Sequence, residues 1–169
     1  MIKLTEYIRK SSRYLRAGDV KDGDVVEIIS EGRIRPAEES RFGRESFEID
    51  VRLSDGSEKV WTVNKTTLQN LAEVYGDETK NWVGRKVYLA VRTREMRNEP
   101  RKVILGFPDA VVEFLLKDVR KVYPDRVDID TLSRLMKNVR GFKMDPEEAA
   151  RAAGLRIVEE GGRKYVVFR

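Results

Sequence analysis

Apolar and polar positions alternate with a period of two in the first part of the chain, which indicates β-strands. The clearest case runs from Phe47 to Leu53, where apolar residues alternate with Glu48, Asp50 and Arg52. A Ser-Asp-Gly-Ser sequence follows at 54–57 and supplies the residues that a hairpin turn needs. The pattern predicts strands over residues 25–34, 47–53, 59–63, 85–94 and 102–107.

One helical segment interrupts these strands. Asn64 can cap it, and Leu68, Leu71 and Val74 give it an apolar stripe before Gly76. Three strands, one helix and two further strands make the order of a small closed β-barrel with one inserted helix. This is the OB architecture, a common carrier of single-stranded nucleic acids and oligosaccharides. We expect the barrel to occupy residues 19–107, after a basic N-terminal arm or helix over residues 1–18 in which Tyr14 and Leu15 continue a helical spacing.

The period changes from two to helical after Pro108. An apolar stripe predicts a helix over 111–122, and either Asp128 or Asp130 can cap a second helix that extends to Val139. Asp145 and Pro146 mark a third helix start, and a hairpin over 156–168 ends the chain. We therefore predict an α+β protein whose residues 108–169 form a three-helix, winged-helix-like module. Its core is either independent of the barrel or packs on the barrel's open end.

Residues 14–107 resemble a family of small OB-fold proteins from phages and mobile elements. The matching residues are Tyr14-Leu15-Arg16-Ala17-Gly18-Asp19, Val63-Asn64-Lys65-Thr66-Thr67, Gly76-Asp77 and Trp82-Val83-Gly84-Arg85-Lys86-Val87. The resemblance implies an OB fold and single-stranded nucleic-acid binding. The order of barrel and helical module is also similar to the middle subunit of replication protein A.

The absence of Cys and His removes several chemistries. It excludes disulfides, thiol nucleophiles, zinc ribbons and histidine general bases. No apolar run approaches the length of a membrane span and no secretory signal is visible, so we expect a cytoplasmic protein without a cofactor. The 37% of charged residues is typical of a thermophile.

The net charge of +5 is concentrated in two predicted loops. Segments 33–44 and 92–102 hold nine basic and four acidic residues, and they would flank the ligand groove of an OB barrel. Arginine suits both phosphate binding and base stacking. The alternative is that these loops only solubilise the protein. With Arg52 on the outward face of the second strand, the predicted nucleic-acid-binding residues are Arg33, Arg35, Arg41, Phe42, Arg44, Arg52, Tyr88, Arg92, Arg94, Arg97, Arg101 and Lys102.

Aromatic residues divide between stacking and packing. Phe42 lies in the first loop and Tyr88 on the outward parity of the fourth strand, so each is a candidate for base stacking or for ordinary packing. Trp61 shares its parity with Val63, and we expect it in the core. Trp82 is expected to plug the end of the barrel.

Glu48 and Asp50 face outward on one strand and could in principle hold Mg²⁺. A third ligand is lacking, and we expect these carboxylates to pair with arginines across the strand instead. Glu78-Thr79-Lys80 is similar to a nuclease motif but lies in a loop.

The sequence therefore predicts single-stranded DNA or RNA binding through a basic groove, with no catalytic residues. Residues 108–169 would dock a protein partner or add DNA contacts through Lys117, Arg120, Lys121, Arg163 and Lys164. An adaptor whose two modules both bind proteins is the first alternative, and a Mg²⁺-dependent nuclease is the second.

Overall fold

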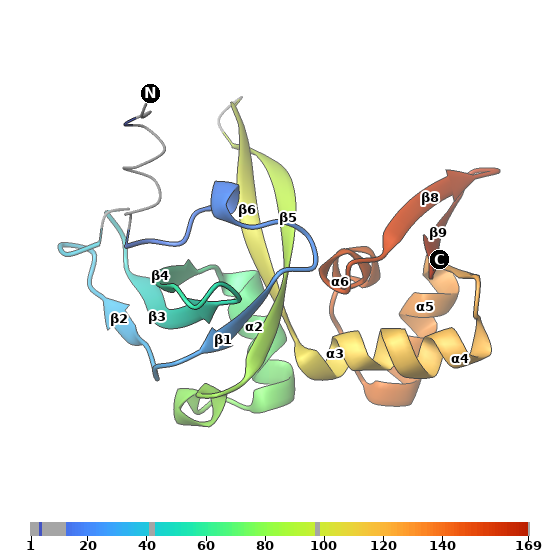
Figure 1. The fold of residues 1–169 in the computed structure, drawn as a ribbon, viewed down its shortest axis with the longest axis horizontal. Helices are drawn as coiled ribbons and strands as arrows, with labels where there is room; N and C mark the ends of the chain where they lie inside the picture. The colour runs from blue at the N-terminus through green and yellow to red at the C-terminus, as the bar shows by residue number, and fades with distance from the viewer. Residues whose placement is uncertain (1–3, 5–12, 41–42, 97–98, 169) are drawn as a thin grey trace.

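The computed structural model describes residues 4, 13–40, 43–96 and 99–168. Within these residues the protein is α+β, as predicted, and its strands form two antiparallel sheets. Figure 1 shows the larger sheet in the first part of the chain and a group of helices with a smaller sheet in the second. No helix in the described part of the chain is long and apolar enough to cross a membrane.

The larger sheet has the strand order β2-β3-β1-β5-β6, and β4 pairs with the other edge of β3. Strands β5 and β6 pair from Val87↔Pro108 to Met96↔Glu99, whereas β1 reaches only Lys86–Tyr88 of β5. The outer part of the β5–β6 hairpin therefore projects beyond the sheet (Figure 1). The elements are η1 (Ala17–Asp19), β1 (Val25–Ile28), β2 (Arg33–Arg35), β3 (Ser46–Leu53), β4 (Glu58–Val63), α2 (Lys65–Tyr75), η2 (Thr79–Trp82), β5 (Lys86–Met96) and β6 (Glu99–Pro108).

The first predicted strand is broken in two. Strand β1 pairs with one half of β3 (Val26↔Leu53), and β2 pairs with the other half (Ile34↔Phe47). Gly32 lies between them with φ +81°, and a Cβ at this position would lie 2.6 Å from the Ile49 side chain. A continuous strand over 25–34 was therefore wrong, because the chain turns sharply where only glycine fits against β3.

Residues 14–16, directly before η1, are not helical. Tyr14 forms a parallel bridge with Val60 of β4, and the Leu15 N–H donates to the Val60 carbonyl at 2.8 Å. The Leu15 side chain is buried in the core of the first sheet. The helical spacing therefore does not predict Tyr14 and Leu15 correctly, because backbone pairing with β4 decides their conformation.

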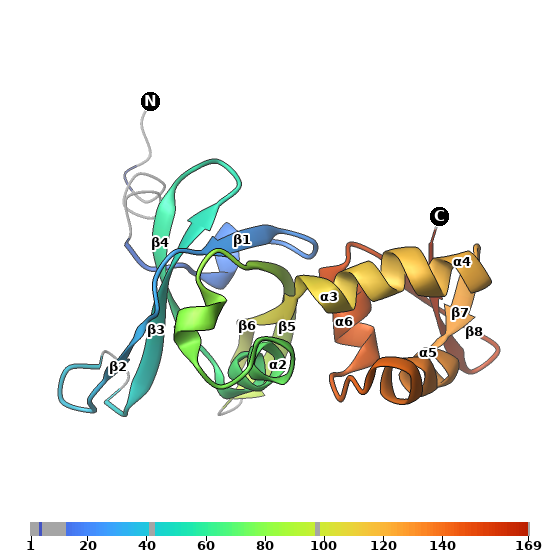
Figure 2. The same ribbon diagram turned by 90° about the horizontal axis from the view of Figure 1, so that it is seen from below.

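Helix α2 is seated on β6 by polar side chains. Asn64 caps the helix by accepting from the Thr67 N–H at 2.9 Å, as predicted, and its amide donates to the Ile104 carbonyl at 2.7 Å. The Gly106 N–H donates to the Thr67 hydroxyl, and the Gly106 carbonyl accepts from Asn70, both at 3.0 Å. Figure 2 shows α2 beside β5 and β6 in this arrangement.

The second part of the chain contains the predicted helices and hairpin. Asp128 and Asp145 are the helix caps, each accepting a backbone N–H. A short strand, β7, was not predicted, and it pairs with β9 to complete the smaller sheet. The elements are α3 (Asp109–Glu113), η3 (Phe114–Val119), α4 (Arg120–Val122), β7 (Arg126–Asp128), α5 (Ile129–Leu135), η4 (Met136–Arg140), α6 (Pro146–Ala152), β8 (Arg156–Glu160) and β9 (Arg163–Val167).

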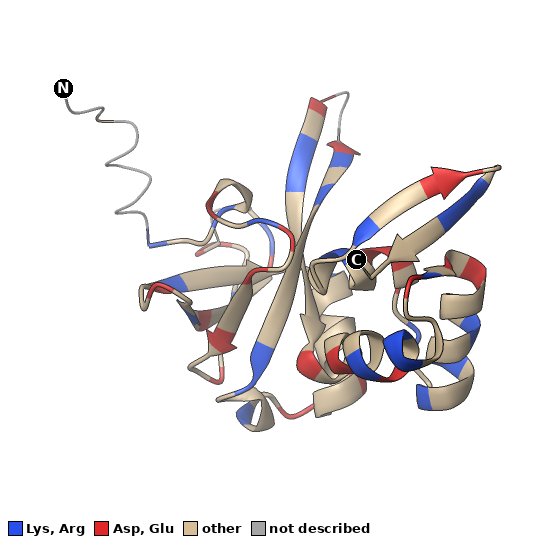
Figure 3. Ribbon diagram, turned by 45° about the vertical axis from the view of Figure 1, so that its right-hand side comes forward, with Lys and Arg blue, Asp and Glu red and all other residues tan. Residues whose placement is uncertain are grey.

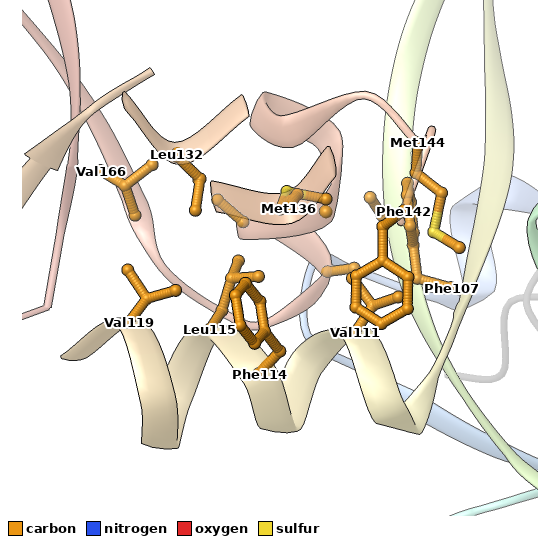
Figure 4. Packing of buried hydrophobic residues seen from close by; sticks show 14 of the residues in the cluster. Phe107, Val111, Phe114, Leu115, Val119, Leu132, Met136, Phe142, Met144 and Val166 are labelled. Atoms are coloured by element: carbon orange, nitrogen blue, oxygen red, sulfur yellow. The ribbon is translucent and has the colours of Figure 1, made fainter. Parts of the chain in front are cut away.

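Buried side chains form a separate cluster in each part. Trp61 and Trp82 lie in the first cluster, 2% and 3% exposed, which confirms that both are packed inside. The second cluster lies among the helices but also includes Ala90, Leu105 and Phe107 from β5 and β6. Figure 4 shows Phe107 beside Val111 and Phe142. The second core is therefore built from residues on both sides of position 108.

Candidate nucleic-acid interface

Three of the predicted arginines lie on the outer face of the first sheet. Strand register places Arg33 beside Glu48, and Arg52 beside Glu27 and Glu58. Because side chains alternate between the faces of a strand, Glu48, Asp50 and Arg52 of β3 share this outer face. The outer face of this sheet therefore presents a ladder of alternating charges.

Ion pairs occupy this ladder. Arg35 Nε lies 3.0 Å from Glu48 Oε1, and Arg33 Nε lies 3.3 Å from the same oxygen. Arg33 also reaches Asp50 at 3.2 Å, while Arg52 lies 3.1 Å from Glu27. The prediction that Glu48 and Asp50 pair with arginines across the strand is confirmed. Glu48 is buried, however, although its parity suggested an exposed position.

The ionisation of these groups follows from their partners. Burial would raise the pKa of Asp50, but hydrogen bonds from Arg33 and Ser30 outweigh it, and the pKa lies below its usual value. A side-chain hydrogen bond to Glu48 raises the pKa of Arg35. Glu48 and Asp50 balance the charges of Arg33 and Arg35 through these ion pairs, so the two arginines are less available to a phosphate.

The projecting β5–β6 hairpin carries a different set of basic side chains. Register pairs Arg94 with Arg101 and Thr93 with Lys102, so the two arginines share one face of the ribbon and Lys102 lies on the other. All three side chains are exposed, and none makes an ion pair with another described residue. Figure 3 shows basic positions along both strands, with acidic positions near the hairpin's end.

Arg92 lies nearer the base of the same hairpin and is paired. Its guanidinium contacts the carboxylate of Glu148 on α6. The sequence pattern did not identify Glu148 as part of this region. The Asp145-Pro146-Glu147-Glu148 sequence indicates a helix start and carries no signal for a partner 56 residues away.

Tyr88 does not lie with these bases. Its outward parity is correct, but the outward face of β5 is covered here by the C-terminal helices, and Tyr88 packs half-buried against their core. Arg44 is exposed before β3 and makes no ion pair with any described residue. Arg41, Phe42 and Arg97 lie outside the described residues.

The described residues include no group of three His, Cys, Asp or Glu side chains that could hold a metal ion. Glu48 and Asp50 are engaged by the arginines of β2. Glu78, from the nuclease-like triplet, pairs with Lys80 at 3.2 Å on the surface.

Two open depressions on the surface have mixed charge. One, of about 450 Å³, is lined by Asp128, Asp130, Thr131, Ser133, Arg134 and Arg163. The other, of about 290 Å³, lies beside β4 and is lined by Arg13, Ile29, Asp50, Glu58, Lys59 and Val60. Acids and bases are equal in number in each lining, so neither has the excess of positive charge found on the β5–β6 hairpin. No known family model, curated protein or solved structure matches this chain.

Proposed function

We propose that this protein binds single-stranded nucleic acid. The basic side chains of the β5–β6 hairpin would make the main contacts with the phosphate backbone. The observation that carries the proposal is the exposure of Arg94, Arg101 and Lys102 without an ion pair among the described residues. Unpaired guanidinium and ammonium groups on a projecting ribbon can follow a phosphate backbone.

The strand connections support an OB barrel as the scaffold. Strands β1 and β2 both pair with β3, and β1 also pairs with β5, while β4 pairs with the other edge of β3 and β6 pairs with β5. Helix α2 lies between β4 and β5 in the chain, and the β5–β6 hairpin takes the place of the ligand-flanking loop after the fourth strand.

A winged-helix-like arrangement is our proposal for the C-terminal module. Strand β7 lies between two helices and pairs with β9, so the terminal hairpin is extended into a small sheet. Helix α6 would be the reading helix, but its first turn contains Glu147 and Glu148. This acidic turn favours single-strand binding on the neighbouring hairpin over insertion of α6 into a duplex groove.

Salt-dependent titration tests the proposal. The oligonucleotides are labelled dT and rU strands of about 20 nucleotides and a duplex of equal length. We expect the double variant Arg94→Gln/Arg101→Gln to bind the strands more weakly. The plot of log affinity against log salt should also flatten, by about 0.7 for each phosphate that the variant no longer neutralises.

Lys21→Gln/Lys137→Gln removes the same charge from exposed positions outside the predicted binding residues and serves as the matched control. If both double variants lost affinity equally, the loss would be due to net charge alone, and the binding site would lie elsewhere. A wild-type protein that binds none of the oligonucleotides would reject the proposal and favour an adaptor that binds proteins.

A further inference from the structure

Carboxylates in the first turn of α6 form ion pairs with basic residues from two hairpins. Glu148 pairs with Arg92 on β5, and Glu147 Oε2 lies 3.3 Å from the Lys164 ammonium on β9. Figure 1 shows α6 between the base of the β5–β6 hairpin and the β8–β9 hairpin, both of which project to the same side of the molecule. The two adjacent carboxylates thus face basic groups on both sides.

Arg92 lies on the same face of the ribbon as two of the unpaired basic residues, Arg94 and Arg101. Register places Arg92 opposite Val103, two residues from the Arg94–Arg101 pair and on the same face of the ribbon. The Glu148 side chain is only 14% exposed, whereas Arg92 is 46% exposed. A phosphate arriving from solvent would therefore meet Arg92 with its charge already matched by a carboxylate from inside the fold.

We propose that Glu147 and Glu148 are affinity-limiting residues of this interface, because they compete with phosphate for Lys164 and Arg92. The inference rests on the proposed nucleic-acid binding. In the free protein the two carboxylates occupy Arg92 and Lys164. Only the outer basic residues Arg94, Arg101 and Lys102 are then available to the phosphates of a strand. A bound strand reaches Arg92 or Lys164 only by displacing a carboxylate, so each ion pair subtracts one phosphate contact from the interface.

Burial supports this view of Glu148. Desolvation raises the pKa of Glu148, the neighbouring Asp145 raises it further, and the nearby Arg92 and Arg94 lower it. Both arginines therefore act on this one carboxylate, and its neutralisation would free positive charge on the ribbon face that contains Arg94 and Arg101.

The test is a titration of the labelled dT strand with Glu148→Gln, which keeps the side-chain shape and removes the charge. We expect about three- to tenfold tighter binding at low salt and a slope steeper by about 0.7, the change for one additional neutralised phosphate. Glu147→Gln should give a similar increase, because it frees Lys164 and also Arg151, whose guanidinium lies 3.3 Å from Glu147 Oε1. It provides an independent variant should Glu148→Gln prove poorly folded by circular dichroism.

Glu113→Gln on α3 is the matched control, since Glu113 is exposed and has no ion pair among the described residues. It changes the net charge by the same amount, and we expect less than a twofold effect. In an Arg92→Gln background, Glu148→Gln should increase affinity no more than this control does, because the base it would free is missing.

The outcomes separate the two proposals. If wild-type protein binds the strand but Glu148→Gln and Glu147→Gln match Glu113→Gln, the carboxylates only tie the elements together and the inference fails. A full increase from Glu148→Gln in the Arg92→Gln background would also overturn it. If neither wild-type protein nor the glutamine variants bind any oligonucleotide, the proposed function fails and the inference fails with it.

Discussion

Ion pairs on the outer face of β3 connect β2 to the sheet, and each arginine of β2 contributes to them. Arg33 contacts both Glu48 and Asp50, and Arg35 shares Glu48. Exposed pairs of this kind contribute about 0–1 kcal/mol each. Glu48 differs because it is buried, so removing both arginines would leave a carboxylate without solvent or a partner. The cluster therefore fixes the position of β2 more than it adds to stability.

The lowered pKa of Asp50 predicts a pH-dependent contribution to folding. Its pKa in the folded state lies below the unfolded value of about 3.9, so ionised Asp50 stabilises the fold above that pH. The contribution is lost as the pH falls through the folded-state pKa. We expect Asp50→Asn to lower the free energy of unfolding near neutral pH, with the difference from wild type shrinking as the pH falls below about 4.

Urea unfolding at a series of pH values measures this difference. Asp77→Asn is the control, since Asp77 is exposed and makes no ion pair with a described residue. A difference between wild type and Asp50→Asn that stays constant over the pH range would mean that Asp50 acts by packing and not by its charge.

Residues whose role depends on local pattern could be predicted from the sequence. The parity of Trp61 and the capping position of Asn64 are examples, and both are confirmed. The partners of Arg33 and Arg92 lie 17 and 56 residues away, so register and packing decide them and composition does not. Counting bases loop by loop therefore overstated the free charge of segment 33–44.

Helices and strands could be predicted where the pattern of apolar and polar residues extends over many positions. Strand β7 has three residues and is recognised only through its pairing with β9, about 40 positions later. Tyr14 and Leu15 likewise take their extended conformation from β4. The break between β1 and β2 is different, because Ser30, Glu31 and Gly32 interrupt the apolar run and mark the turn in the sequence itself. The other two misses concern segments whose structure is imposed by a distant partner.

The contact between α2 and β6 depends on a glycine. A Cβ at Gly106 would lie 2.7 Å from the Trp61 ring and 2.9 Å from the Thr67 methyl group. Both Gly106 backbone groups are bonded to α2, so the strand cannot move away without breaking these hydrogen bonds. The close approach of helix and strand is thus the reason that this position has no side chain.

We expect Gly106→Ala to destabilise the protein by about 1–3 kcal/mol through overpacking. Thermal unfolding followed by tryptophan fluorescence is the measurement, because Trp61 forms part of the contact. Gly56→Ala provides the comparison, since no atom lies within 4 Å of a Cβ at Gly56, although its φ of +88° adds backbone strain. A Gly106→Ala variant as stable as wild type would show that α2 can shift without cost.

The two parts of the molecule are joined by more than the peptide bond at Pro108. The Tyr75 hydroxyl lies 2.9 Å from Asp109 Oδ1, and the Lys143 N–H donates to Glu73 at 2.6 Å. Burial raises the pKa of Tyr75, with the nearby Asp109 carboxylate also favouring its neutral form. Together with Phe107, which is fully buried in the second core, these contacts favour unfolding of both parts in one transition.

Coupled unfolding can be measured because the two parts carry different signals. Both tryptophans lie in the first part, while most of the helical residues that the structure describes lie in the second. We expect tryptophan fluorescence and circular dichroism to report coincident urea transitions, and Phe107→Ala to lower stability by about 3–5 kcal/mol in both. Val122→Ala, at an exposed position, should leave both transitions unchanged. Separate transitions, with Phe107→Ala shifting only the circular dichroism signal, would instead establish two independent domains divided near residue 108.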